Sequence, residues 1–176
     1  MIELIKEKTA EYLIARKLKD ILLNEHSFTS TLKRAGTFLV LMPEDEKDFR
    51  ASFAVLEYLE SLNKTIKVLT KDYRISLLPA KFRAKSVEIN FGDINKLGLP
   101  NQKLIHKLEQ MKFDGIVDLN RKENLFFSYV SNIVQGKIRI GYVKKGSDKY
   151  YNLQIANKDM DSAKSYNNFL NCLKMF

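Results

Sequence analysis

The chain has 176 residues, of which 45% are hydrophobic and 29% are charged, and it contains only 7 glycines and 3 prolines. This composition excludes disordered, collagen-like and low-complexity chains, and it fits one compact core. The formal net charge of +9 favours a polyanionic partner, which could be nucleic acid, an anionic membrane surface or a phosphorylated small molecule.

The N-terminal region begins with a helical pattern. Apolar residues recur with a period close to 3.6 over 2–23, so we expect an N-terminal amphipathic helix within 1–26. Its acidic and basic residues nearly balance, which favours docking onto the protein's own body or onto a second copy over a membrane surface. The polar residues 27–36 are expected to form a linker.

From residue 37, short apolar runs alternate with stretches of helical periodicity. We expect strands at 37–42, 65–70, 86–90, 113–119 and 137–141, helices at 45–62, 102–111, 123–134 and 161–175, and an extended segment at 150–156. Strands that are apolar on both faces and alternate with helices are typical of a parallel sheet covered on each side. The pattern predicts a single α/β domain over 37–176. Its expected architecture is a three-layer α/β/α Rossmann-like sandwich with a mainly parallel sheet of about five strands and added terminal helices.

Motifs for common cofactors are absent from the sequence. There is no P-loop, and the turn after the first strand has bulk and negative charge at 43–46 where a dinucleotide needs glycines, so no cofactor is expected. His26 and His106 are far apart and have no ligand partner nearby in sequence, so no metal site is expected. Cys172 lies in a predicted amphipathic C-terminal helix and is interpreted as a small hydrophobic core residue rather than a reactive thiolate.

The cellular location is predicted from three negative signals. A lone cysteine cannot form an internal disulfide, the N-terminus lacks the pattern of a secretory signal, and no apolar run is long enough for a transmembrane segment. These features predict a cytoplasmic protein.

Ligands of open parallel sheets bind beyond the carboxyl ends of the strands. Residues that follow those ends are therefore the candidates for ligand binding: Lys71, Arg74, Asp118, Asn120, Tyr142, Lys144 and Lys145. The alternative is that each of these is simply a solvated loop residue.

The positive charge is concentrated in two segments. Residues 64–85 carry a net charge of +6 and residues 137–149 a net charge of +4. A nucleic-acid-binding module could use both segments, although aromatic residues are not interleaved with them and no helix-turn-helix or RNP signature is present. We therefore rank nucleic acid below a small anion.

One region resembles a known enzyme family. The strand Phe113-Asp114-Gly115-Ile116-Val117-Asp118-Leu119-Asn120, a helix, and then Lys137-Ile138-Arg139-Ile140-Gly141-Tyr142 are similar to the N-terminal half of glycosyltransferase family 9, the heptosyltransferases. The resemblance covers about 37–142. It implies the N-terminal, acceptor-side domain of a GT-B fold, with a glycan-lipid precursor as the ligand.

The resemblance also implies a catalytic base. That family has a G-D-x-x-x-x-T-P motif after its first strand, and Asp48 takes the place of its aspartate, although Lys47 replaces the glycine and Phe53-Ala54 replaces Thr-Pro. Asp48 also fits the first turn of a helix, where the macrodipole favours a carboxylate. The family's donor-binding domain has no counterpart in these 176 residues.

These observations predict a heptosyltransferase-like domain that is not catalytic alone and binds an anionic ligand or a protein partner at the strand ends. Two alternatives remain: the basic nucleic-acid-binding module, and a structural subunit that forms a homodimer through the N-terminal helix.

Overall fold

The computed structural model describes residues 8–9, 11–13 and 28–176. Its centre is a six-stranded sheet in the order β3-β2-β1-β4-β5-β6, and every neighbouring pair is parallel. The strands are β1 (Thr37–Leu41), β2 (Thr65–Lys71), β3 (Ser86–Ile89), β4 (Gly115–Asp118), β5 (Ile138–Tyr142) and β6 (Leu153–Ile155). The predicted α/β Rossmann-like fold is confirmed, and the sheet has one strand more than expected.

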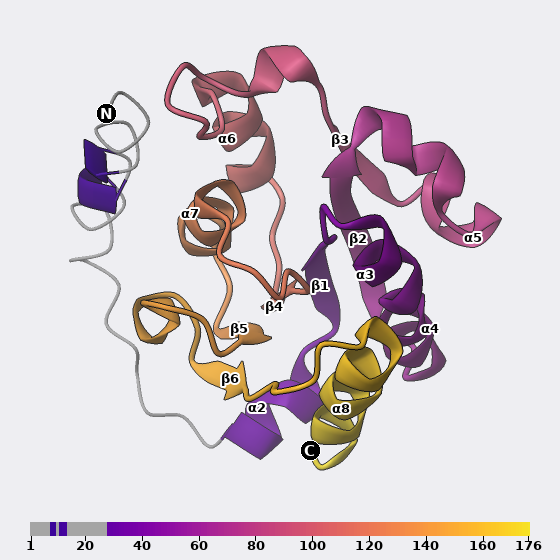
Figure 1. Cartoon of the computed structure of the whole chain (residues 1–176). Helices are drawn as coiled ribbons and strands as arrows, with labels where there is room; N and C mark the ends of the chain where they lie inside the picture. The colour runs from indigo at the N-terminus through magenta and orange to yellow at the C-terminus, as the bar shows by residue number, and fades with distance from the viewer. Residues whose placement is uncertain (1–7, 10, 14–27) are drawn as a thin grey trace.

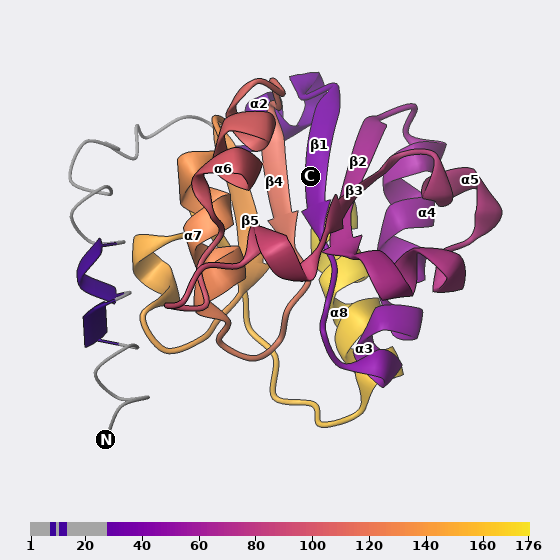
Figure 2. The same ribbon diagram turned by 90° about the horizontal axis from the view of Figure 1, so that it is seen from above.

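Helices cover both faces of the sheet (Figures 1 and 2). One face is covered by α3 (Glu46–Ala51), α4 (Phe53–Ser61) and α8 (Ser162–Lys174), and the other by α6 (Gln102–Glu109) and α7 (Leu125–Ile133). The remaining α-helices described in full are α2 (Phe28–Arg34) and the short α5 (Ala80–Arg83), and 3₁₀ helices span Asp72–Leu77, Phe91–Asp93 and Ser147–Lys149.

Strand β1 shows why the sheet is buried on both faces. Phe38 and Val40 pack with α3, α4 and α8, whereas Leu39 and Leu41 pack with α6 and α7. All four side chains are fully buried. Because successive side chains of a strand point to opposite faces, only a continuous apolar run can supply both layers.

The direction of strand addition reverses between β1 and β4. From β1 the chain adds β2 and β3 on one side, and then returns to add β4, β5 and β6 on the other. Leu41 at the end of β1 lies beside Asp118 at the end of β4. The carboxyl ends of these two strands form the switch point at which doubly wound sheets bind ligands.

Two predicted segments differ from the structure. The expected linker at 27–36 contains helix α2, whereas the segment at 150–156 is extended as expected around β6, which joins the sheet. The single helix expected at 45–62 is divided at Ser52, whose hydroxyl donates to the carbonyl oxygen of Phe49 (2.7 Å). Residues 8–9 and 11–13 are helical, and the rest of the predicted N-terminal helix lies outside the described residues.

Candidate functional site

The loop after β1 places Asp48 in the first turn of α3, as one of the two interpretations of this residue predicts. Asp45 is the N-cap, and its side chain accepts hydrogen bonds from the backbone N–H groups of Lys47 (2.9 Å) and Asp48 (3.1 Å). The bond from Asp48 is the main cause that lowers the pKa of Asp45. The cap fixes the first turn of α3 so that Asp48 turns inward, where it is only 3% exposed.

The Asp48 carboxylate is held by an arginine and a serine. Arg121 donates from Nε to Oδ2 (2.9 Å) and pairs through Nη2 with Oδ1 (2.7 Å), while the hydroxyl of Ser162 donates to Oδ1 (2.7 Å). Arg121 Nη1 also donates to Ser165 Oγ (2.9 Å) at the start of α8. The hydrogen bond with Asp48 raises the pKa of Arg121. We call Asp48, Arg121, Ser162 and Ser165 the Asp48 cluster; its carboxylate is neutralised and covered.

A second buried network lies at the ends of β4 and β5. Asp118 Oδ1 accepts from the backbone N–H (2.9 Å) and side-chain Nδ2 (2.7 Å) of Asn120, and its Oδ2 accepts from Lys144 Nζ (2.8 Å) and the Tyr151 hydroxyl. Lys144 Nζ also donates to the Asn120 carbonyl (2.8 Å). Burial raises the pKa of Tyr151 well above its usual value, so its phenol stays a donor. We call Asp118, Asn120, Lys144 and Tyr151 the Asp118 cluster.

Four of the residues expected to bind a ligand, Asp118, Asn120, Tyr142 and Lys144, therefore have their side chains inside the protein. The side chains of Asp118 and Lys144 are 1% and 4% exposed, and Asn120 is also buried. The Tyr142 hydroxyl donates to the Ser165 carbonyl (3.2 Å) beneath α8, and burial raises its pKa. These side chains are buried in this structure and are bound to protein groups, and their role in binding a ligand stays a prediction. Lys145 is exposed and lies outside the cavity described next.

An open cavity of about 220 Å³ lies at the carboxyl ends of β1, β2 and β3, next to the start of α7. We call it the Glu44 pocket; its lining residues are Glu44, Lys71, Ile89, Ile94, Gly98, Asn124, Phe126 and Phe127. Lys71 Nζ and Glu44 Oε1 form an ion pair at 2.8 Å, with the lysine side chain 30% exposed. The loop between β3 and α6 is held by Asn95, whose side chain accepts from the backbone N–H groups of Leu97 (2.9 Å) and Leu99 (3.1 Å).

Arg74 adds a second cation beside this pocket. Its Nη2 donates to the carbonyl oxygen of Glu44, while Nε and Nη1 are buried without a hydrogen-bond partner. The guanidinium carbon lies 5.3 Å from the ring centroid of Phe49 and 5.6 Å from that of Tyr73. Lys71 thus pairs with the Glu44 carboxylate and Arg74 with the Glu44 carbonyl oxygen, beside the acidic turn at 44–46.

Comparison with known proteins places the chain in a family. A model described as a family of unknown function, DUF6913, matches residues 6–176. The chain belongs to this family. No curated protein and no solved structure matches the chain.

In this DUF6913 chain, the sequence does not predict three residues whose side chains complete the Asp48 and Asp118 clusters. Ser162, Ser165 and Tyr151 come from segments far from the residues they bind, and nothing local in the sequence marks them. Asn124 could have been found, because an Asn before an apolar helical run is a typical N-cap; its side chain accepts from the backbone N–H of Phe127 (3.3 Å).

Two further searches concern only the described part of the chain. There, no group of three or more His, Cys, Asp or Glu residues could hold a metal ion. Nor does any described helix combine the length and apolarity needed to cross a membrane.

Proposed function

We propose that this chain is a binding domain, not catalytic on its own, that holds a small hydroxylated anion in the Glu44 pocket. A sugar phosphate or sugar carboxylate has this chemistry, and a glycan-lipid precursor would present such a group. The proposal extends the resemblance to the acceptor-side domain of glycosyltransferase family 9. The observation that carries it is an open cavity at the carboxyl ends of the strands, with an ion pair at its wall.

The lining of the pocket supports this class of ligand. Lys71 and Asn124 can donate to phosphate or hydroxyl oxygens, and Glu44 can accept from hydroxyls. Phe126 and Phe127 offer an apolar wall against which a sugar ring can pack. The volume of about 220 Å³ lies below the roughly 300–1,000 Å³ of pockets for drug-sized ligands, which favours a single sugar unit.

The state of Asp48 supports the absence of autonomous catalysis. A general base must reach the proton that it removes, at about 2.6–3.2 Å from the donor atom. Both oxygens of Asp48 are bound by Arg121 or Ser162, and the residue is 3% exposed. An acceptor hydroxyl has no access to this carboxylate while the start of α8 covers it.

A nucleic-acid function receives less support from the same geometry. Within the basic segment 64–85, Lys81 and Lys85 pair with Glu60 and Lys71 pairs with Glu44. In the segment 137–149, Lys144 is buried on Asp118 and Arg139 is buried with its Nε bound to the Ser131 carbonyl (2.8 Å). Neither segment presents its full positive charge to a phosphate backbone.

Calorimetric titration with glucose 6-phosphate, glucose and inorganic phosphate tests the binding function. We expect glucose 6-phosphate to bind more tightly than either of the other two, because only this probe engages both the cations and the hydroxyl-binding groups. Lys71→Met should weaken its binding about tenfold, the usual cost of losing a charged hydrogen bond. Lys67→Met, an exposed lysine on the same strand, is the matched control and should bind like the unmodified chain.

Two results would contradict the proposal. Absence of glucose 6-phosphate binding, or equal weakening by Lys71→Met and Lys67→Met, would remove the Glu44 pocket as the site. Turnover of a nucleotide sugar by the purified chain alone would refute the non-catalytic part.

A further inference from the structure

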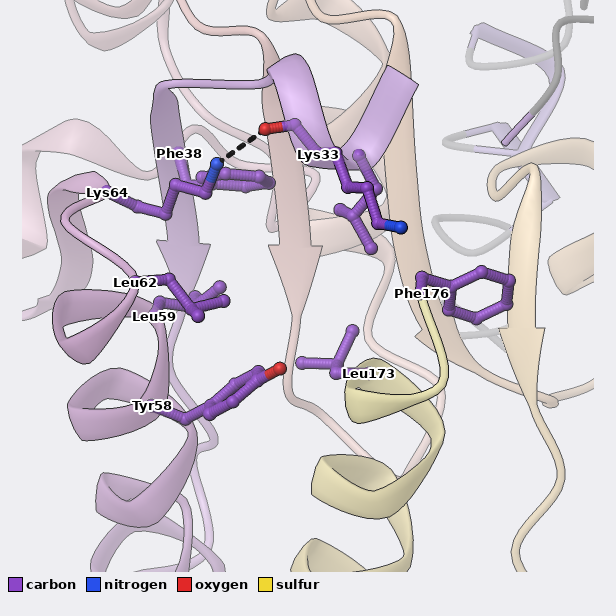
Figure 3. Close-up of a pocket in the computed structure, with 9 residues that line it drawn as sticks. Lys33, Phe38, Tyr58, Leu59, Leu62, Lys64, Leu173 and Phe176 are labelled. Carbon is purple, nitrogen blue, oxygen red and sulfur yellow. Dashed lines mark hydrogen bonds between the residues drawn. The ribbon is translucent and has the colours of Figure 1, made fainter. Parts of the chain in front are cut away.

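A larger and more apolar cavity lies at the opposite end of the sheet (Figure 3). Its volume is about 300 Å³, and it is bounded by α2, α4 and the end of α8 near the start of β1. The walls are mostly apolar side chains, namely Leu32, Phe38, Leu59, Leu62, Leu173 and Phe176. We call this cavity the Leu173 pocket. It shares no lining residue with the Glu44 pocket.

The few polar groups of the Leu173 pocket are gathered on two sides. Lys33 and Lys64 line it, and Lys64 Nζ donates to the Lys33 carbonyl oxygen (2.9 Å). An ammonium has three donors, so this bond leaves Lys64 with two donors for a ligand. On the other side, the hydroxyl of Tyr58 points toward Leu173 (Figure 3).

Three lysines bring positive charge to the pocket. Among the described residues, no ion pair involves Lys33 or Lys64, in contrast to Lys71, Lys81, Lys85 and Lys144, which all pair with carboxylates. Lys174 adds a third ammonium, 5.8 Å from the ring centroid of Tyr58. An apolar interior beneath several cations complements a molecule with an apolar body and one negative end.

We propose that the Leu173 pocket binds a small amphipathic carboxylate, with its hydrocarbon part among the leucines and its carboxylate on Lys64 and Lys33. The size matches this class, because about 300 Å³ is at the lower end of ligand cavities and accommodates a medium-length chain. A phosphorylated sugar fits less well, since six of the nine lining side chains are aliphatic or phenylalanine and offer its hydroxyls no partners. This site is independent of the function proposed for the Glu44 pocket.

Calorimetric titration with butanoate, hexanoate, octanoate and decanoate tests the proposal. Each buried methylene is worth about 0.8 kcal/mol, so affinity should rise about fourfold per added CH₂ until the cavity is full. Octanoate should bind at least tenfold more tightly than octanol, because only the acid engages the lysines. No binding, or binding that does not depend on chain length, would overturn the proposal.

Three variants locate the site. Lys64→Met keeps the aliphatic stem, removes the ammonium, and should abolish the preference for octanoate over octanol. Lys107→Met, an exposed lysine on α6, is the matched control and should leave that preference unchanged. Leu62→Trp places a larger side chain in the lining of the Leu173 pocket. Because Leu62 is 46% exposed, the fold should tolerate the substitution while octanoate binding is lost.

Thermal unfolding serves as a second readout on the same variants. The melting temperature of Leu62→Trp should stay close to that of the unmodified chain, which shows that the variant is folded whether or not the Glu44 pocket binds a ligand. Octanoate binding that survives Leu62→Trp, or that falls equally in Lys64→Met and Lys107→Met, would place the acid elsewhere and contradict the assignment.

Discussion

The ion pair between Asp118 and Lys144 fixes the ends of β4 and β5 at the centre of the sheet. Both side chains are withdrawn from water, and the carboxylate is held further by Asn120 and Tyr151. The attraction of a buried pair is largely offset by the cost of removing both charges from water. Removing one partner is strongly destabilising, because the cost of keeping the remaining charge out of water is then uncompensated.

Lys144→Met should lower the free energy of unfolding by about 3–5 kcal/mol, since it leaves the Asp118 carboxylate buried and unpaired. Urea denaturation measures this change. Lys145→Met, at the exposed neighbouring position, should change stability by less than about 0.5 kcal/mol. The double variant Asp118→Asn/Lys144→Met should recover part of the loss, and a Lys144→Met as stable as the control would contradict the account.

Asp114 stabilises the opposite, amino end of the sheet. Its Oδ2 accepts from the backbone N–H groups of Gly36 (2.8 Å) and Thr37 (2.9 Å) and from the Thr37 hydroxyl (3.0 Å). These hydrogen bonds lower the pKa of Asp114 below its ordinary value of 3.8, and the bond from the Gly36 backbone N–H has the largest effect. The carboxylate therefore contributes stability that is complete above pH 3.8 and is lost as the pH falls through the lower, folded value.

Asp114→Asn should remove this pH-dependent contribution. At neutral pH the variant should be less stable by about 1 kcal/mol, because an amide oxygen is a weaker acceptor than a carboxylate. Well below pH 3.8 the two proteins should unfold at nearly the same temperature, as thermal denaturation across pH would show. A stability difference that stayed constant down to the lowest pH would count against this role.

At the scale of the element, close packing between β1 and β4 depends on a glycine. A Cβ built on Gly115 would lie 2.5 and 2.8 Å from two ring carbons of Phe38, its neighbour on β1. That ring belongs to the core beneath α4 and α8, so it has little room to move. The glycine thus lets a large aromatic side chain pack at the middle of the sheet.

Gly115→Ala should destabilise the protein by about 1–3 kcal/mol, the usual cost of overpacking a core. Gly92→Ala is the matched control, since a Cβ there would meet nothing within 4 Å. Thermal unfolding of the two variants measures the contrast. Equal stability of both would show that Phe38 moves aside at little cost.

The predictable elements are those whose pattern is local. The apolar run at 37–42 could be recognised as a buried strand because both of its faces are apolar. Helix α2 was not predicted because 28–34 is short and polar. Strand β6 was predicted only as an extended segment, because it has three residues with polar Gln154 at its centre. The break at Ser52 is accompanied by the hydrogen bond from its hydroxyl to the Phe49 carbonyl oxygen, and no change in periodicity marks it in the sequence.

Whether each side chain at the candidate site is buried or exposed could not be predicted, because burial depends on contacts between segments far apart in the sequence. The sequence indicates which residues follow a strand, and Lys71 and Lys144 both do. Lys71 borders an open cavity, whereas Lys144 is buried by a carboxylate 26 residues earlier in the chain. Asp48 is likewise covered by Arg121, 73 residues later, and by the start of α8.

At the scale of the whole molecule, the two ends of the sheet differ in what they offer a ligand. At the carboxyl end, the Asp48 and Asp118 clusters close the switch point and leave the Glu44 pocket open beside it. At the amino end lies the apolar Leu173 pocket. We propose that the carboxyl end binds a small hydroxylated anion without performing chemistry on it.

Amide chemical-shift mapping with glucose 6-phosphate tests whether the ligand binds at this end of the sheet. We expect saturable shifts centred on Glu44, Lys71, Gly98 and Asn124, with the amides around the Leu173 pocket unchanged. Shifts that are absent, or that cluster on surface lysines away from the Glu44 pocket, would contradict the proposal.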